Sequence, residues 1–298
     1  MNRILPFIVL LPLMGILCGC PVTQEQQTPV QPQLQSANGH AYWLYVPSNY
    51  TPAREWPMVV TLHGTFGFDS GDAQVREWKK LGEDNGVIVV APSCQSVQGI
   101  LPVVKALRDK DLEADEQAVL AIMDEVEAKY KIGTYQVDNK PWKESKTAGT
   151  PKVGKLLATK PPKADAAAKH ASTKPAAEKT TRPAVMLTGF SAGGYPMYYI
   201  GLRNPQRFGI LVGRSCNSQM EMMDRIPVTD EARQLPIYIF WGRDDTGLNH
   251  MCWDAVAWLS NHGFKHLEWK QVLGGHARHP EYAWQFWKKM LPTEMKPE

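Results

Sequence analysis

The chain has 298 residues, of which 43% are hydrophobic and 21% are charged, with a formal net charge of +3. This ordinary globular composition excludes a wholly disordered chain and an integral membrane protein. The length allows one large or two small domains. The charge is uneven, since residues 138–182 hold eleven Lys and Arg against four Asp and Glu, leaving twenty-two against twenty-six elsewhere. We therefore expect a mildly acidic folded part.

The first twenty residues have the pattern of an export signal. Arg3 precedes an apolar run over 4–17, which is too short for a comfortable membrane span of about 20 residues. Leu17-Cys18-Gly19-Cys20 resembles a bacterial lipobox, so we expect Cys20 to carry a lipid that anchors the chain in the bacterial cell envelope, in the periplasm or on the outer surface. An ordinary signal peptide or an uncleaved anchor is the alternative, because Cys18 is unusual two places before a cleavage point.

Residues 21–38 are rich in Gln, Pro, Thr and Ser, which predicts a disordered tether. Beyond it, 39–291 alternates strand-like and helix-like patterns. Strands are predicted at 57–62, 87–91, 184–188, 208–213, 235–241 and 267–273, and helices at 73–85, 113–130, 192–204, 251–262 and 281–290. This alternation predicts one α/β domain with a mainly parallel sheet and helices on both faces. Ligands then bind at the carboxyl ends of the strands.

Residues 137–183 break this pattern with a Lys-, Ala-, Pro- and Thr-rich stretch, which predicts a flexible low-complexity insert. Its basic character would suit anionic lipid or polysaccharide. We expect no nucleic-acid partner, because the stretch lacks the aromatic residues on which bases stack. A solvated loop with no partner is the simpler interpretation.

Gly189-Phe190-Ser191-Ala192-Gly193 stands between a predicted strand and a predicted helix. That context is typical of a nucleophile elbow, a sharp turn that lifts a serine hydroxyl out of the sheet. The outer glycines suit such a turn, because side chains at these positions would collide with the neighbouring strand and helix. A glycine-rich turn without chemistry is the alternative for so short a motif.

Three further motifs end predicted strands in the order that an elbow serine needs. His63-Gly64-Thr65 follows the first strand, so the N–H of Thr65 and the N–H of Ala192 are expected to form an oxyanion hole. Gly242-Arg243-Asp244-Asp245 supplies a carboxylate. Gly274-Gly275-His276 supplies an imidazole, which is needed because a serine hydroxyl is a weak nucleophile without a base.

The chain resembles serine hydrolases of the α/β-hydrolase fold. More narrowly, the segment 42–47 (Tyr-Trp-Leu-Tyr-Val-Pro) followed by the segment 57–64, which ends in His63-Gly64, resembles the secreted esterases grouped with polyhydroxybutyrate depolymerases, feruloyl esterases and acetyl xylan esterases. The resemblance implies Ser191 as nucleophile, His276 as base and Asp245 as acid. The adjacent Asp244 departs from the pattern and leaves the acid open, although the spacing from Gly242 favours Asp245.

The resemblance implies a serine hydrolase that cleaves carboxylic esters, polysaccharide-linked or polymeric ones among them, through an acyl-serine intermediate. A serine peptidase of the prolyl-oligopeptidase type has the same motif order, but this chain lacks a large gating domain. A non-catalytic binding protein on a hydrolase fold is a third alternative. The mechanism requires no cofactor and no metal, and no Cys-x-x-Cys pair suggests zinc.

Three smaller expectations concern residues outside the triad. Cys94, Cys216 and Cys252 allow at most one internal disulfide, and the sequence does not choose the pair. Most of the ten tryptophans are expected to pack in the core rather than bind sugar. Asp69 and Asp72 are expected to cap the helix that follows them, with the mouth of the site as the alternative.

Overall fold

The computed structural model describes residues 31–98, 109–142 and 179–296. The export signal with Cys20, most of the expected tether and the middle of the insert lie outside the described residues. No helix in the described ranges is long and apolar enough to cross a membrane.

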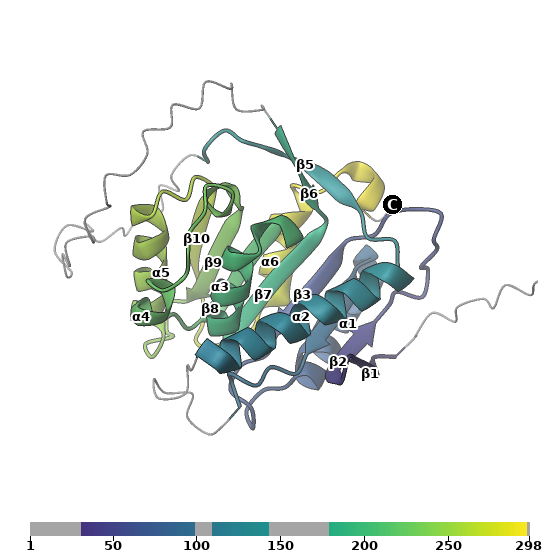
Figure 1. The fold of residues 1–298 in the computed structure, drawn as a ribbon, viewed down its shortest axis with the longest axis horizontal. Helices are drawn as coiled ribbons and strands as arrows, with labels where there is room; N and C mark the ends of the chain where they lie inside the picture. The colour runs from purple at the N-terminus through teal and green to yellow at the C-terminus, as the bar shows by residue number, and fades with distance from the viewer. Residues whose placement is uncertain (1–30, 99–108, 143–178, 297–298) are drawn as a thin grey trace, which may run out of the picture.

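An eight-stranded sheet forms the centre of the molecule, in the order β1-β2-β4-β3-β7-β8-β9-β10 (Figure 1). The first two strands are antiparallel to their neighbours, and all later neighbours are parallel. The bounds are β1 Gln33–Ala37, β2 His40–Tyr45, β3 Met58–Leu62, β4 Ile88–Pro92, β7 Val185–Ser191, β8 Ile210–Cys216, β9 Ile237–Gly242 and β10 Leu267–Val272. The six predicted strands are all present in it.

Helices cover both faces of this sheet, as expected (Figure 1). Their bounds are α1 Gly71–Asn85, α2 Asp109–Lys129, α3 Gly194–Arg203, α4 Met220–Met223, α5 Asn249–Asn261 and α6 Pro280–Lys288. The buried side chains of α2, α3 and α5 join one core cluster, and those of α1 and α6 join the other. Val59 and Val60, successive residues of β3, belong to different clusters, because side chains alternate across a strand. The parallel strands are therefore buried on both faces.

Two expectations about domain limits are wrong at their edges. The tether was expected to run to Asn38, but Gln33–Ala37 forms β1 and pairs with β2. The sequence of this strand is polar and gives no strand pattern, because an edge strand is hydrogen-bonded to one neighbour only and buries few of its side chains. The insert was expected over 137–183, but both of its ends are ordered: β5 (Thr134–Asp138) pairs with β6 (Lys179–Pro183) antiparallel. Tyr135 and Val137 of β5 reach the core, which fixes this ladder on the domain.

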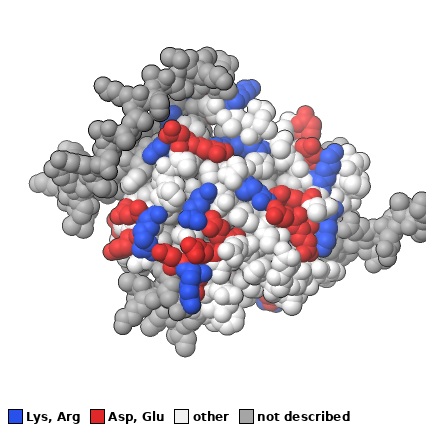
Figure 2. Space-filling model, viewed as in Figure 1, with Lys and Arg blue, Asp and Glu red and all other residues white. Residues whose placement is uncertain are grey.

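Charged side chains of both signs are interspersed on the face that carries α2 (Figure 2). Arg203 pairs with Glu116, and Arg207 pairs with Asp124 and Glu127. This face therefore shows no extended field of a single sign. The three cysteines Cys94, Cys216 and Cys252 are buried as free thiols. Trp241, Trp258, Trp284 and Trp287 are core residues, as expected.

Candidate active site

Ser191 occupies a strained turn at the carboxyl end of β7. Its φ is +51°, a left-handed conformation that non-glycine residues rarely adopt. The two glycines of the motif make this turn possible: a Cβ at Gly189 would lie 2.3 Å from the Gly193 carbonyl oxygen, and a Cβ at Gly193 would lie 2.5 Å from the Leu62 carbonyl oxygen. The backbone thus has the geometry of the predicted elbow, and α3 begins directly after it.

The strand beside the elbow is distorted as well. Phe190 pairs with Arg214 and Ser191 with Cys216, so Ser215 is an extra residue in β8, with a φ of +42°. Such a bulge re-aims the chain at the end of a strand. The N–H of Asn217 then donates to the Ser191 carbonyl oxygen at 2.8 Å. The segment that follows β8 thereby holds the backbone of Ser191 in its strained conformation.

His276 and Asp245 meet at the same edge of the sheet, beyond β9 and β10. Nδ1 of His276 donates to Oδ2 of Asp245 at 2.8 Å. Asp245 is buried, whereas the neighbouring Asp244 is exposed. The His276 ring also stacks on Phe190, the residue before Ser191, with 4.7 Å between ring centroids. The imidazole is therefore held next to the elbow from two sides.

The loop after β3 runs against the elbow. A Cβ at Gly64 would lie 3.1 Å from the Cβ of Ser191, so only a glycine fits this close approach without displacing a neighbour. The backbone N–H groups of Thr65 and Ala192 have no acceptor within the described ranges of the chain. Two unpaired donors on the segments that flank Ser191 match the arrangement that an oxyanion hole requires.

His63 orients one of these donors. The Cys94 N–H donates to Nε2 of His63 at 3.1 Å, so the ring proton is on Nδ1. Nδ1 then donates to the Gly64 carbonyl oxygen at 2.8 Å. This carbonyl belongs to the same peptide group as the Thr65 N–H, and a peptide group is planar. Fixing the carbonyl therefore fixes the direction in which the N–H points.

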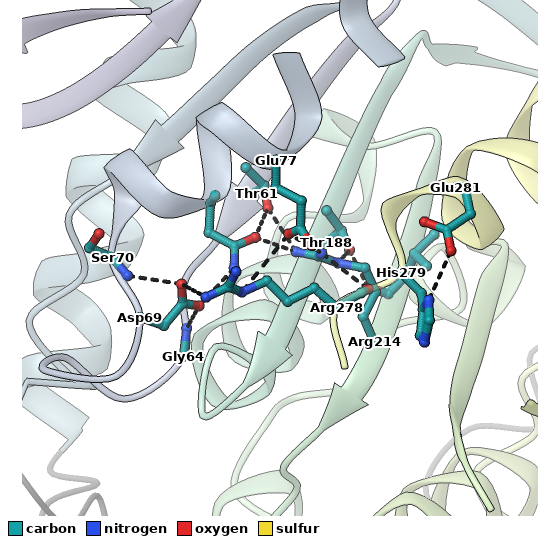
Figure 3. A network of polar contacts seen from close by, with 12 residues as sticks. Thr61, Gly64, Asp69, Ser70, Glu77, Thr188, Arg214, Arg278, His279 and Glu281 are labelled. Carbon is teal, nitrogen blue, oxygen red and sulfur yellow. Dashed lines mark hydrogen bonds and ion pairs between the residues drawn. The ribbon is translucent and has the colours of Figure 1, made fainter. Parts of the chain in front are cut away.

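A buried polar network lies beneath the site, and sequence inspection did not find it (Figure 3). Arg214 of β8 is fully buried and donates to Thr188, Thr61 and Gln74. Burial lowers the pKa of Arg214 to about 10, which leaves the guanidinium charged at neutral pH. Glu77 lies 3.8 Å from the Arg214 guanidinium and 3.9 Å from that of Arg278, which is two residues after His276.

Burial raises the pKa of the Glu77 carboxyl, and the charges of Arg214 and Arg278 oppose that rise. No local pattern marks any of these residues, because each acts through contacts with residues far away in the chain. A buried arginine between two strands is visible only once the strands are placed side by side.

Asp69 was expected to cap the helix, and this expectation is wrong. Ser70 is the cap, since its Oγ accepts the Ala73 N–H at 3.2 Å. Asp69 is buried and instead accepts the Gly64 N–H at 2.7 Å and pairs with Arg278 at 3.1 Å. Asp72 lies in the first turn of α1, where a negative charge is favourable, and pairs with Arg76.

A scan against protein-family models found no match to this sequence, and a search of curated proteins found none either. Solved structures do match. A ferulic acid esterase from Anaeromyces mucronatus is 14% identical with a TM-score of 0.52, over 89% of this chain and 91% of that one. The S-formylglutathione hydrolase of Staphylococcus aureus is 13% identical with a TM-score of 0.50, over 87% and 93%.

The chain has the α/β-hydrolase fold. This confirms the fold predicted from the elbow and from the alternation of strands and helices. The neighbours share too few residues with this chain to transfer a substrate, so the function must be argued from the residues at the sheet edge.

Proposed function

We propose that this protein is a serine esterase that cleaves carboxylic esters through an acyl-serine intermediate. The observation that carries the proposal is a strained Ser191 whose neighbour Phe190 stacks on the ring of His276, which is itself hydrogen-bonded to Asp245. Two similar structures whose names describe them as a ferulic acid esterase and an S-formylglutathione hydrolase support the same class of reaction.

In the proposed mechanism His276 first acts as the general base. Its Nδ1–H is hydrogen-bonded to Asp245, so Nε2 carries no proton and takes that of the Ser191 hydroxyl as Oγ attacks the ester carbonyl. Asp245 stabilises the resulting imidazolium. The N–H groups of Thr65 and Ala192 bind the oxyanion, and one such donor typically stabilises the transition state by about 2.7 to 4 kcal/mol.

His276 transfers one proton in each half of the reaction, first that of Ser191 and then that of water. In the first half it passes the serine proton to the departing alcohol oxygen, which leaves an acyl group on Ser191. Water then attacks the acyl-enzyme with His276 again as base, and the carboxylic acid leaves as Ser191 recovers its proton. Apart from the ester and water, every group in these steps belongs to this chain.

The surroundings of the site favour an ester with an apolar part. The described residues expose four large hydrophobic side chains, and three of them, Phe66, Phe68 and Leu273, lie on the loops that carry Thr65 and His276. A contiguous exposed apolar patch on a soluble protein marks an interaction or ligand-binding site. A polysaccharide-linked or polymeric ester with an apolar acyl group fits this rim.

A substrate panel tests the proposed function. We expect the wild-type protein to hydrolyse p-nitrophenyl acyl esters and to prefer them to aminoacyl amides, with feruloyl esters as a third set. Preference for the amides would favour a serine peptidase. No turnover of any substrate, together with no labelling by a fluorophosphonate, would favour a non-catalytic binding protein.

We also propose that the enzyme is held in the bacterial envelope by a lipid on Cys20. Leucine three places before it and glycine directly before it support this. Acyl chains contribute about 0.8 kcal/mol per buried methylene, so two or more anchor a protein firmly. Cys20→Ser should abolish lipid modification and Cys18→Ser should not. Mass spectrometry of the mature N-terminus is the measurement, and an unmodified residue 20 in the wild type would refute the anchor.

A further inference from the structure

The loop that carries His276 is connected to the loop that carries Thr65 by one ion pair. Nη2 of Arg278 lies 3.1 Å from Oδ1 of Asp69. Arg278 is two residues beyond His276, and Asp69 is four residues beyond Thr65. The two loops leave the sheet at β10, its edge strand, and at β3, near its middle, with β7, β8 and β9 between them. The pair therefore bridges strands that do not touch.

Asp69 fixes the backbone of its own loop at both ends. Its Oδ2 accepts the Gly64 N–H at 2.7 Å and a proton from Gln74 Nε2 at 2.7 Å, and its backbone N–H donates to the Thr65 carbonyl oxygen at 3.0 Å. The peptide group that contains the Thr65 N–H is thus enclosed between two hydrogen bonds to one residue. Movement of Asp69 would move this N–H as well.

Arg278 is fixed in turn from the interior of the sheet. Its carbonyl oxygen accepts from Arg214 at 3.3 Å, and its guanidinium lies 3.9 Å from Glu77 (Figure 3). The guanidinium also lies 5.6 Å from the centre of the Phe190 ring. His276 stacks on that same ring. The two arginines and the two carboxylates Asp69 and Glu77 balance in charge, which keeps a partly buried ionic cluster in place.

We propose that Arg278 and Asp69 are positioning residues that set the imidazole of His276 and the Thr65 N–H at the correct separation for one reacting group. The proposed role of both residues is to hold backbone segments and does not involve a contact with the substrate. Arg278 holds the segment that follows His276, and Asp69 holds the peptide that binds the oxyanion, so their ion pair couples the base to the oxyanion hole. The inference rests on the proposed esterase function and deepens it.

The test compares Arg278→Gln, Arg278→Lys, Asp69→Asn and the double variant Asp69→Asn/Arg278→Gln. Arg207→Gln is the matched control, because Arg207 has a similar exposure, 25% against 29%, and also pairs with two carboxylates, Asp124 and Glu127. For each variant, kcat and KM on p-nitrophenyl acetate, the rate of fluorophosphonate labelling and the midpoint of thermal unfolding are measured.

We expect Arg278→Gln to lower kcat by about 10- to 100-fold with KM changed less than about threefold, since a misplacement near 1 Å costs about 100-fold. Arg278→Lys should restore kcat to within about fivefold of wild type, because an ammonium can keep the ion pair. The double variant should be no slower than the slower single variant, because both remove the same coupling. The control should keep wild-type kcat.

Several outcomes would overturn the inference. The first is a kcat of Arg278→Gln within twofold of wild type. The second is a double variant whose fold-loss in kcat equals the product of the two single fold-losses. The third is an equal loss of kcat in the control Arg207→Gln. A rate loss that follows a lowered unfolding midpoint in both Arg278 variants, without rescue by lysine, would assign the pair to stability alone. A wild-type protein that neither hydrolyses esters nor takes up fluorophosphonate would contradict the proposed function together with the inference.

Discussion

Two adjacent aspartates follow β9, and the structure places them in different environments. Asp245 is buried 2.8 Å from the His276 ring, whereas Asp244 is exposed and its backbone N–H donates to the Gly274 carbonyl oxygen. Consecutive residues point in different directions, so one imidazole can receive only one of the two carboxylates. This arrangement agrees with the sequence spacing, which favoured Asp245, three residues after Gly242, as the acid.

The first prediction follows at this scale. Asp245→Asn keeps the shape of the side chain but favours the wrong imidazole tautomer, so we expect kcat to fall by about 10⁴-fold. Asp244→Asn, the matched control on the same loop, should change kcat only a few-fold. Steady-state kinetics on one p-nitrophenyl ester decides this, with circular dichroism to verify folding. If Asp244→Asn lost its activity and Asp245→Asn kept it, the acid would be Asp244.

The candidate triad could be predicted from the sequence because each member ends a strand within a short motif. The supporting residues could not. Asp69 stands beside a helix start, where capping is the usual role of an aspartate, and only the folded chain brings Arg278 to it from a distant loop. Arg214 lies in a strand that reads as apolar, and its partners Thr61, Gln74 and Thr188 come from three other elements.

At the scale of elements, β10 begins beside a buried histidine with unusual surroundings. His266 is fully buried and lies edge-on to Trp142 at 5.6 Å, and its two ring nitrogens have no hydrogen-bond partner in the described part of the chain. Burial, with the charges of Arg182 and Lys265, lowers the pKa of this imidazole, while Asp138 opposes the shift. The folded protein therefore holds His266 neutral at a pH where the unfolded chain is protonated.

The second prediction is a pH dependence of stability. The unfolded chain binds a proton near pH 6.5 and the folded chain only at lower pH, so the free energy of unfolding should fall as pH drops below about 6.5. His266→Phe should reduce this fall, with each unit of pKa difference removed worth about 1.4 kcal/mol. Urea unfolding of both proteins at pH 8 and pH 5 is the measurement. An equal fall in the free energy of unfolding between pH 8 and pH 5 in wild type and His266→Phe would contradict the account.

The strands with apolar cores could be predicted, while the polar ones could not. Met58–Leu62 and Ile237–Gly242 are buried along their whole length, so composition alone marks them. Gln33–Ala37 is largely exposed and gains its conformation from pairing with β2, which no local pattern records. Lys179–Pro183 is similarly polar, and it is a strand because Thr134–Asp138 lies beside it.

At the scale of the whole molecule, the β5–β6 ladder and the candidate active site lie at opposite ends of β7. The β5–β6 ladder leads into the amino end of β7, while Ser191 stands at the carboxyl end of the same strand. The ladder pairs over five residues on each side, from Thr134 with Pro183 to Asp138 with Lys179. The ladder therefore joins the two described ends of the insert to each other.

The third prediction is that the basic insert is dispensable for chemistry. Replacing residues 143–178 by a short Gly-Ser linker should keep kcat within about twofold of wild type. It should leave stability unchanged or raise it by up to about 2 kcal/mol, because each halving of a loop removes about 0.6 kcal/mol of closure entropy. Steady-state kinetics and chemical unfolding are the readouts. Loss of activity in a folded variant would show that the insert contributes to the site.

The central claim is that Ser191 is the nucleophile of an ester hydrolase, and trapping the acyl-enzyme tests it most directly. Wild-type protein is mixed with p-nitrophenyl acetate, quenched in acid within the first turnover, digested and analysed by mass spectrometry. We predict an acetyl group on Ser191, none in Ser191→Ala, and a fall in kcat of about 10⁶-fold in that variant. An acetyl group on another residue, or hydrolysis that survives Ser191→Ala, would contradict the account.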